Sequence, residues 1–290
     1  MPIRYRPIVA AEIAEAVDLF LIALADLARR NGLPSPAHYT HEAVEPIYRY
    51  IQQTGIFEVA EHDGRIVGIC CATVRDAIWF LAMFWLLPEA QLKGVGRPLL
   101  ERVMAEGTRR GARIYCTWSS IDFAAVGLYL KLGLMPECPI FTFAGAVVSE
   151  PRTPQGLALR TLEIDQAGAI DGVVRGTQRT ADHRFWHEQG AQGFQVQRGQ
   201  QRIGYFYVSQ GNIGPAAWLQ AADGPALLAC ALRAASERSQ AVKLVALGHN
   251  HCAVRAALDA GLRLAGASHC LRSGPFGQLD RYVPSGPALF

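Results

Sequence analysis

The segment Gln91–Arg97 has the composition of an anion-binding loop. It follows an apolar run at residues 77–87 and leads into a stretch whose apolar residues recur at helical spacing. Pro98 fits this helix only in its first turn, where a missing N–H costs nothing, so we expect the helix to begin between Gly94 and Gly96. The unpaired N–H groups at the positive end of a helix favour a phosphate or pyrophosphate. The glycines let the backbone approach such a group, and the lysine and arginine of the segment add positive charge.

Two common phosphate loops are excluded by spacing. A dinucleotide-binding fingerprint needs a third glycine, and Leu99 occupies that position. A P-loop needs Gly-Lys followed by Ser or Thr, which the chain does not contain. What remains is Gln-x-x-Gly-x-Gly between a predicted strand and a predicted helix. A tight strand–helix turn with incidental glycines is the alternative interpretation of the same residues.

A second pattern lies downstream of this loop. After a predicted strand at residues 112–118, the spacing predicts a short helix with Asp122 as candidate N-cap and Gly133 as candidate C-cap. Together the two patterns resemble the GCN5-related N-acetyltransferase (GNAT) family, which carries Arg/Gln-x-x-Gly-x-Gly/Ala and then Asn-x-x-Ala-x-x-Leu-Tyr-x-x-x-Gly-Phe. The resemblance is best over Phe57–Leu134. The later motif is matched at Ala125, Leu128, Tyr129 and Gly133, and is not matched at Asp122 and Leu134.

The resemblance implies a fold, a reaction and a site. The fold is of the α/β class, with a mixed central sheet flanked by helices. The reaction transfers an acetyl group from acetyl-CoA, as co-substrate, to a primary amine of a small-molecule acceptor. Tyr129 is implied as the catalytic general acid beside the thioester sulfur. The residues implied in cofactor binding are Leu86, Leu87, Gln91, Leu92, Lys93, Gly94, Val95, Gly96, Arg97, Asp122 and Ala125.

Tyr129 has the chemistry that this role needs, although it could also serve only as a packing residue. A phenol with a pKa of about 10 is protonated at neutral pH and can protonate a departing thiolate, whose thiol has a pKa of about 8.5. Deprotonating an alkylammonium with a pKa of about 10.4 costs about 5 kcal/mol at pH 7. GNAT members often place a glutamate on the fourth strand, but residues 77–87 contain no carboxylate. No base is assigned; the alternatives are Glu45, Asp76, Ser119, Ser120 or a water chain.

Composition narrows the class of protein. The chain has 290 residues, of which 50% are hydrophobic and 18% charged, which suits two packed domains rather than disorder. A formal net charge of +3 is too small for a nucleic-acid-binding surface. The seven cysteines include no Cys-x-x-Cys, which favours reduced, packing cysteines in a cytoplasmic protein. Acidic residues near the amino terminus argue against a signal peptide, and the run at residues 77–87 is too short to cross a bilayer.

Hydrophobic periodicity predicts one complete domain over residues 1–149. Strands are expected near residues 3–8, 57–60, 65–74, 77–87, 112–118 and 140–148, and helices near 13–27, 40–51, 95–104 and 122–133. A linker follows at residues 151–156, which contain two prolines and a glycine. This order of elements also matches that of the acetyltransferases.

The pattern then begins again. Residues 194–208 echo 57–69, and residues 253–262 echo 125–134. A repeat of this length indicates a duplicated domain at residues 150–290 rather than a solenoid.

The two halves differ where chemistry would occur. The second half lacks Gln-x-x-Gly-x-Gly, and Asp223 is expected to cap the corresponding helix and occupy its free amides. Ala257 stands where the first half has Tyr129. The second half is therefore predicted to be a degenerate copy that walls the substrate cleft or replaces a dimer partner.

The acceptor amine is expected at the first two helices and the loop at residues 30–39. Tyrosines in this region could form an aromatic amine pocket or belong to the core; they are Tyr39, Tyr48 and Tyr50. Two histidine pairs occur without the Glu or Cys pattern of a metal site, so no metal is predicted; they are His183/His187 and His249/His251.

Two hypotheses from other functional classes remain open. The missing strand carboxylate also suits a non-catalytic acyl-CoA-binding or sensing protein. A third hypothesis is a protein-interaction module without a ligand. No nucleic-acid or membrane partner is predicted, and both a monomer and a homodimer are compatible with the sequence.

Overall fold

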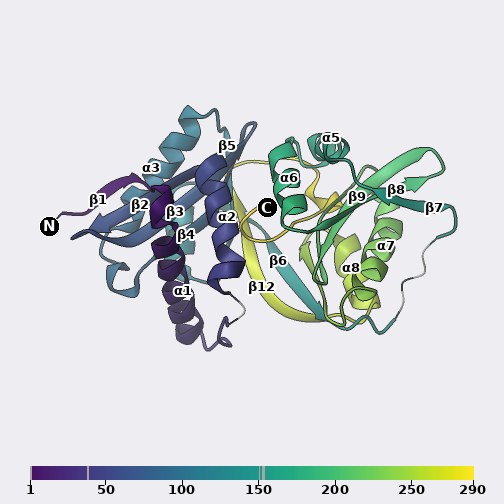
Figure 1. The fold of residues 1–290 in the computed structure, drawn as a ribbon, viewed down its shortest axis with the longest axis horizontal. Coiled ribbons are helices and arrows are strands. Elements are labelled where there is room, and N and C mark those ends of the chain that lie inside the picture. Colours follow the sequence, from purple (N-terminus) through teal and green to yellow (C-terminus); the bar gives the residue numbers. More distant parts are fainter. Residues whose placement is uncertain (1, 38, 150, 152–153) are drawn as a thin grey trace. The chain divides into compact units, whose positions relative to one another are not determined.

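The structure is a computed structural model that describes residues 2–37, 39–149, 151 and 154–290 (Figure 1). Its contacts divide the chain into two compact units. Unit 1 extends to Thr117 and includes Asp122–Leu132. Unit 2 comprises Trp118–Ile121 and Gly133–Phe290. The predicted linker lies partly outside the described residues.

Unit 1 is built on a sheet with the strand order β1–β2–β3–β4–β5. Its neighbours are antiparallel except β4 and β5, which run parallel. The β2–β3 hairpin turns at Asp63 and Gly64, whose φ angles of +50° and +75° are those of a tight two-residue turn. The strands are β1 Arg4–Pro7, β2 Ile56–His62, β3 Arg65–Arg75, β4 Ile78–Leu86 and β5 Ile114–Ser119.

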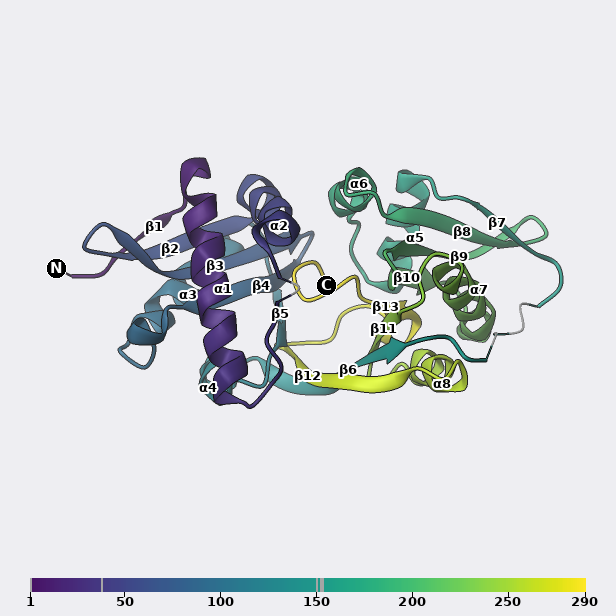
Figure 2. The ribbon, with the colours of Figure 1, turned by 60° about the horizontal axis from the view of Figure 1, so that its bottom comes forward.

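Helices cover both faces of this sheet. Helices α1 and α2 lie over one face and α3 over the other (Figure 2). Cys70 and Cys71 are adjacent in β3, so their side chains point to opposite faces of the sheet. Tyr48 of α2 lies near Cys71 and Tyr129 of α4 lies near Cys70, which places α2 and α4 on opposite faces. The helices are α1 Ile13–Arg30, α2 His41–Thr54, α3 Gly96–Arg109 and α4 Phe123–Lys131, with short 3-10 turns at Ala10–Glu12 and Pro88–Ala90.

Two glycines bring α3 close to the sheet. A Cβ on Gly107 would lie 2.3 Å from Cδ1 of the buried Trp79. A Cβ on Gly68 of β3 would lie 2.4 Å from Leu86 Cδ2 and 3.4 Å from Leu99 Cδ2. A glycine inside a helix costs about 1 kcal/mol relative to alanine, and the contact with Trp79 explains why one stands at residue 107.

The strands of unit 2 have the order β12–β6–β11–β10–β9–β8–β7 and mixed directions, and β13 pairs with β10. Among the pairings within unit 2, over the described residues, only that of β10 with β11 is parallel. The strands are β6 Met135–Gly145, β7 Leu157–Thr161, β8 Gln192–Arg198, β9 Gln201–Ser209, β10 Asn212–Trp218, β11 Val242–Leu247, β12 Arg263–Arg272 and β13 Tyr282–Val283. The helices are α5 Ile164–Val174, α6 Thr180–Glu188, α7 Gly224–Ser236 and α8 His251–Asp259, with 3-10 turns at Ala221–Asp223 and Leu279–Arg281.

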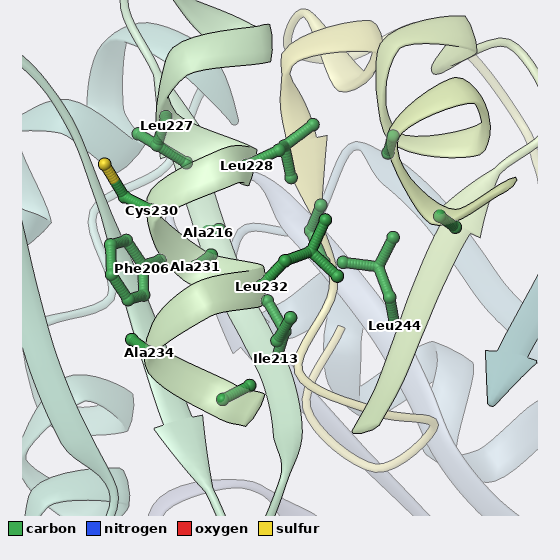
Figure 3. Packing of buried hydrophobic residues seen from close by; sticks show 14 of the residues in the cluster. Phe206, Ile213, Ala216, Leu227, Leu228, Cys230, Ala231, Leu232, Ala234 and Leu244 are labelled. Carbon is green, nitrogen blue, oxygen red and sulfur yellow. The ribbon is translucent and has the colours of Figure 1, made fainter. Parts of the chain in front are cut away.

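The main core of unit 2 forms where α7 packs on the sheet. This helix is buried along most of its length, which is typical of a helix that is apolar on most sides. Leu227, Leu228 and Leu232 are each at most 1% exposed, and burying one leucine contributes about 1.5–3 kcal/mol. Their neighbours in the cluster include Phe206, Ile213, Ala216 and Leu244 from three strands (Figure 3).

The elements from β7 to β12 repeat the order from β1 to β6. Each series runs strand, two helices, hairpin, strand, 3-10 turn, helix, strand, helix and strand. This confirms the predicted α/β class and the prediction of two tandem domains of similar fold.

Strand β6 is placed differently from our expectation. A strand near residues 140–148 was expected to complete the first domain, but β6 lies in unit 2 between β11 and β12 and is antiparallel to both. There both of its edges are hydrogen-bonded, which removes an exposed strand edge. Hydrophobic periodicity predicts a strand but not the strands it pairs with, because those lie far away in the sequence. The boundary near residue 149 separates the two similar halves and remains a prediction.

A buried ionic cluster lies between α5, α6 and β9 in unit 2. The fully buried Asp171 carboxylate accepts hydrogen bonds from Arg179 Nε at 2.8 Å and from the Tyr205 hydroxyl at 2.5 Å, and lies 3.0 Å from His183 Nε2. Burial alone would raise the pKa of Asp171, but Arg179, His183 and Tyr205 outweigh burial and lower this pKa to about 2. His183 is therefore a hydrogen-bonded core residue, whereas His187 is exposed.

Replacing Arg179 by methionine should lower the free energy of unfolding of unit 2 by about 3–5 kcal/mol at pH 7, because a buried carboxylate loses a counter-ion. The pKa of Asp171 is depressed in the folded state, so this stabilisation is present above the unfolded-state pKa of about 4 and is lost as the pH falls toward 2. Urea denaturation should therefore show the difference between wild type and variant narrowing from pH 4 to pH 2.

The matched control is Arg184→Met, at an exposed position of the same helix. It should change the free energy of unfolding by less than about 0.5 kcal/mol. Equal losses for the two substitutions would contradict a stabilising role of the cluster.

Candidate functional site

The predicted anion-binding loop lies at the start of α3. The helix begins at Gly96, Val95 is its N-cap without a side-chain cap, and Pro98 is the third helical residue, as predicted. The backbone N–H groups of residues 92–97 donate to no acceptor within the described part of the chain. Uncommitted amides at the positive end of a 14-residue helix form a site for an anionic group.

Two residues of this loop have left-handed backbone. The φ angles are +59° at Leu92 and +80° at Gly94. The conformation costs a leucine about 1–2 kcal/mol and costs glycine little. The Leu92 side chain is also 91% exposed, so burial does not compensate for the strain. Strain of this kind clusters at ligand-binding segments, which supports a functional role for the loop.

Gly96 sets the distance between the helix start and strand β4. A Cβ at this position would lie 2.9 Å from Phe84 Cζ and 3.0 Å from Leu86 Cδ1. The next residue after β4, Leu87, is 2% exposed, and its N–H donates to the Val67 carbonyl at 3.0 Å. The amides of the loop are therefore held at the end of β4 by close packing.

Arg30, at the end of α1, also belongs to this site and was not predicted. Its guanidinium donates to Asp26 Oδ2 at 2.8 Å, to Gln91 Oε1 at 3.3 Å and to Asp122 Oδ2 at 3.3 Å. Gln91 in turn donates from Nε2 to the Leu86 carbonyl at 3.1 Å. This network joins the loop to α1, β4 and α4. The sequence gives no sign of it, because 61 and 92 residues separate Arg30 from Gln91 and Asp122.

Strand β4 has an edge that β5 leaves open. The two strands pair only where Ile78–Leu81 lies opposite Ile114–Thr117. Beyond that point the register of β4, through Leu86, is with β3. An extended ligand could add to such an edge through main-chain hydrogen bonds.

Tyr129, the predicted general acid, lies on α4 near this strand. It is 5% exposed, and its ring centroid is 6.2 Å from that of Phe84. Burial, and then the nearby Cys70 and Asp122, raise the pKa of the Tyr129 phenol well above its ordinary value. The hydroxyl is therefore protonated at neutral pH, as a proton donor must be.

The start of α4 is already occupied by its own cap. The Asp122 carboxylate accepts from the backbone N–H groups of Ala124 at 2.9 Å and Ala125 at 3.2 Å. This confirms Asp122 as the N-cap. Two of the predicted cofactor-binding residues, Asp122 and Ala125, are thus paired with each other, and the open amides are those of α3.

The two cations of the loop lie on its surface. Lys93 and Arg97 are both exposed. Arg97 Nε pairs with Glu101 at 2.8 Å, but both side chains are largely solvated, and such a pair contributes at most about 1 kcal/mol. Its guanidinium can therefore exchange this partner for a phosphate at little cost.

The tyrosines considered for an amine pocket have different environments. Tyr48 is fully buried, with its ring 5.6 Å from Phe57, and is a core residue. The Tyr50 hydroxyl accepts a hydrogen bond from Arg75 at 3.1 Å. Tyr39 is half-buried.

Tyr39 belongs to an aromatic group at the end of β4. Phe20 of α1 packs edge-on against Tyr39 at 5.6 Å and against Trp85 at 5.2 Å. Trp85 is next to Phe84 along the strand, so the two side chains point to opposite faces. The group therefore lies on the α1–α2 face of the strand that carries the open edge.

Two of the alternatives for a general base lie away from Tyr129. Glu45 pairs with Arg49 at 2.5 Å on α2, which covers the opposite face of the sheet from α4. Asp76 forms the turn between β3 and β4, at the far end of β4 from the loop. Ser119 and Ser120 belong to unit 2.

The corresponding helix start in unit 2 is different. Asp223 is the N-cap residue of α7, but the prediction that its carboxylate occupies the free amides is wrong: the side chain makes no cap hydrogen bond and pairs with Arg198 Nη1 at 2.7 Å. The arginine on β8 competes successfully for the carboxylate because the hairpin brings it there. The helix start in unit 2 therefore carries a buried aspartate in an ion pair, where the start of α3 carries no acidic side chain in its first turn. Ala257 is the seventh residue of α8, as Tyr129 is of α4.

Residues 23–134 match the model of the acetyltransferase (GNAT) family. The matched segment contains the loop before α3, all of β4, Arg30 and Tyr129. This match confirms, for residues 23–134, the resemblance to the GNAT family drawn from the sequence.

Solved structures share this fold over nearly the whole chain. A putative acetyltransferase from Pyrococcus horikoshii has a TM-score of 0.80 at 17% identity, covering 99% of this chain and 96% of its own. A tandem GNAT protein from the clavulanic acid biosynthesis pathway has a TM-score of 0.63 at 13% identity, covering 94% and 99%. A GCN5-related N-acetyltransferase from Sphaerobacter thermophilus has a TM-score of 0.67 at 15% identity, covering 96% and 98%. At these identities the comparison establishes the tandem fold alone.

Curated relatives, membrane-spanning helices and metal-ligand groups were all looked for without a match. No curated protein matches the sequence. Within the described residues, no helix has the length and apolar character to span a membrane. The same residues contain no group of three or more His, Cys, Asp or Glu side chains that could hold a metal ion.

Replacing Gly94 by alanine should weaken the binding of coenzyme A at least about tenfold. The added Cβ meets no protein atom but enforces strain at a φ of +80° and stands beside the open amides. Isothermal titration calorimetry measures the change. The matched control is Gly111→Ala, at a φ of +91° beyond the other end of α3, also with no protein atom within 4 Å. Equal loss of affinity in both variants would show that backbone strain, rather than the anion site, is responsible.

Proposed function

We propose that this protein is an N-acetyltransferase that transfers an acetyl group from acetyl-CoA to a primary amine of a small-molecule acceptor. The observation that carries the proposal is the set of open amides at residues 92–97, next to a strand edge and a protonated Tyr129. The family of residues 23–134 supports the same reaction class. The second half is proposed to be a non-catalytic copy.

The diphosphate of the cofactor is proposed to bind at the start of α3. Open backbone N–H groups bind phosphate oxygens, and the helix dipole favours their charge. Lys93, Arg97 and Arg30 add positive charge around the loop. The exposed Leu92 offers an apolar contact for the cofactor.

The pantetheine arm is proposed to extend along the open edge of β4. Its two amides can pair with main-chain groups of residues 82–86 as an added strand would. This path leads from the loop at Gly94–Gly96 back along β4, on which Phe84 contacts Tyr129. The thioester would thereby reach the phenol.

Tyr129 is proposed to protonate the thiolate of coenzyme A as the tetrahedral intermediate collapses. The nitrogen of the acceptor attacks the thioester carbon, the C–S bond breaks, and the phenol proton passes to sulfur. The nitrogen then loses its surplus proton to solvent, and solvent returns a proton to the Tyr129 phenolate. A buried phenol is a weak acid, but a thiolate leaving into the same buried region is a correspondingly stronger base. Holding amine and thioester together contributes about 7–11 kcal/mol of the barrier reduction.

The acceptor is proposed to lie by the aromatic group of Phe20, Tyr39 and Trp85. Aromatic faces attract an alkylammonium, by about 0.5–2 kcal/mol. Because β4 itself carries no carboxylate, the amine is proposed to lose its proton to water before attack. The rate should therefore rise with pH as the free-amine fraction grows.

A second candidate function is an acyl-CoA sensor that binds the cofactor without turnover. The same lack of a carboxylate on β4 favours it. Coenzyme A release from acetyl-CoA across a panel of primary amines separates the two functions. Tight acetyl-CoA binding without turnover on any amine would favour the sensor.

Tyr129→Phe should lower kcat by about 10²–10⁴-fold, the usual contribution of a general acid. The dissociation constant of coenzyme A should change less than about twofold, because the hydroxyl is proposed to act on the leaving sulfur alone. The Tyr129 pKa lies above 10, so wild-type activity should not fall on the alkaline side below that pH.

The control is Tyr115→Phe, which removes a hydroxyl that bonds to Thr108 away from β4's open edge. Its kcat should stay within about twofold of wild type. If Tyr129→Phe retains full kcat, another group protonates the thiolate.

A further inference from the structure

Three reactive side chains meet in unit 2, outside the proposed acetyl-transfer site. Cys138 of β6 and Cys270 of β12 are directly opposed residues of an antiparallel pair. The third side chain is His249, in the turn between β11 and α8. Cys138 is more than a hundred positions from the other two residues, so no local sequence motif identifies the group.

The turn that carries His249 is fixed against β6. The Gly248 N–H donates to the Pro139 carbonyl at 2.7 Å, and a Cβ on Gly248 would lie 2.8 Å from Pro139 Cγ. On the other side, the buried Asn250 caps α8 through the Ala253 N–H at 3.0 Å and donates to the Tyr282 carbonyl at 2.9 Å. Both flanks of His249 are therefore anchored by hydrogen bonds.

The sulfur of Cys138 is hydrogen-bonded as a thiolate would be. Hydrogen bonds from Cys270 and from His249, with the backbone amide of Gly248, outweigh burial and lower the pKa of Cys138 to about 5. The same contact with Cys138 raises the pKa of His249. The charged neighbours are Glu137, which raises the His249 pKa, and Arg272, which lowers it. Both shifts favour the thiolate form of Cys138 beside the protonated form of His249.

The two cysteines are placed for a disulfide. Directly opposed residues of antiparallel strands have Cα atoms about 4.5–5.5 Å apart. A disulfide needs about 4.4–6.8 Å. The register therefore places Cys138 and Cys270 within the Cα range of a disulfide, and neither cysteine is in a disulfide in this structure.

We propose that Cys138, Cys270 and His249 form a dithiol site that reduces hydroperoxides. The Cys138 thiolate attacks the distal peroxide oxygen, the O–O bond breaks, and His249 protonates the departing oxygen as water or an alcohol. The Cys270 thiol then attacks the sulfenic sulfur of Cys138, the S–S bond forms, and water leaves with the Cys270 proton. Two thiols are oxidised to one disulfide, and one hydroperoxide is reduced.

Other cysteines of the chain provide an internal standard. Cys252, in the first turn of α8, is half-buried like Cys138, but burial raises its pKa. Burial likewise raises the pKa of Cys70 and of Cys230. These thiols should react slowly in the same molecule.

Alkylation of the wild-type full chain with iodoacetamide at pH 6 tests the thiolate. At pH 6 a thiol with a pKa of about 5 has about 300-fold more thiolate than a thiol with a pKa of about 8.5. Each thiolate of the lower pKa is about 40-fold less nucleophilic, which reduces this advantage. Cys138 should therefore react roughly tenfold faster than an ordinary exposed thiol, and faster still than Cys252. Peptide mass spectrometry reads each site. Equal or slower alkylation of Cys138 than of Cys252 would overturn the proposal.

One equivalent of hydrogen peroxide tests the oxidation. The full chain should lose about 2 Da, with a Cys138–Cys270 cross-link in the peptide map. Cys270→Ser should instead accumulate a sulfenic acid that dimedone traps at Cys138, and Cys252→Ser should behave as wild type. Oxidation elsewhere while Cys138 and Cys270 stay reduced would refute the site.

His249→Gln tests the third member without removing a sulfur. Loss of the imidazolium should slow alkylation of Cys138 at pH 6 about tenfold and leave Cys252 unchanged. An unchanged rate at Cys138 would exclude His249 from the site. Thermal unfolding of this variant confirms that it is folded.

Discussion

The uncapped start of α3 is the constraint on which the site of unit 1 depends. No side chain of the described residues satisfies its amides, so either water or an anion must. Several features keep these donors open at one place. Gly96 allows close contact with Phe84, Pro98 in the first turn has no N–H to satisfy, and Gly94 supplies left-handed backbone. A capping side chain at Val95 would stabilise the helix by about 1 kcal/mol but would take up an amide that a phosphate could use.

The two halves of the chain show how one fold can be used differently. Both place a helix after the fourth strand of their series, and both begin that helix near a glycine. In unit 1 the helix start is surrounded by arginine and lysine side chains, whereas in unit 2 a buried aspartate paired with Arg198 stands there. The interior of unit 2 instead contains α7 and the ionic cluster around Asp171, whose contacts hold the unit together.

The pairing of β6 with β12 has a chemical consequence. It brings together cysteines from the two halves of the sequence and places them beside a histidine that a tightly packed glycine turn holds. The seven cysteines form no sequence motif, so the sequence predicted only reduced cysteines that pack in the core. That interpretation suits the buried Cys70 and Cys71, whose thiol pKa values are raised. It does not suit Cys138, because the reactivity of a thiol depends on its neighbours in space.

The sequence alone predicted the elements of unit 1, the resemblance to the GNAT family and the uncapped helix start that follows the loop. Those features depend on local rules, such as helical periodicity, the place of Pro98 and the cap at Asp122, which act over a few residues. It did not determine the contacts of Arg30 with the loop, the partner of Asp223 or the strands with which β6 pairs. Each of these depends on contacts between segments far apart in the chain, and side-chain pairing across such distances is selected by packing of the whole fold. The tertiary structure alone therefore decided which charges surround the loop and which two sulfurs face each other.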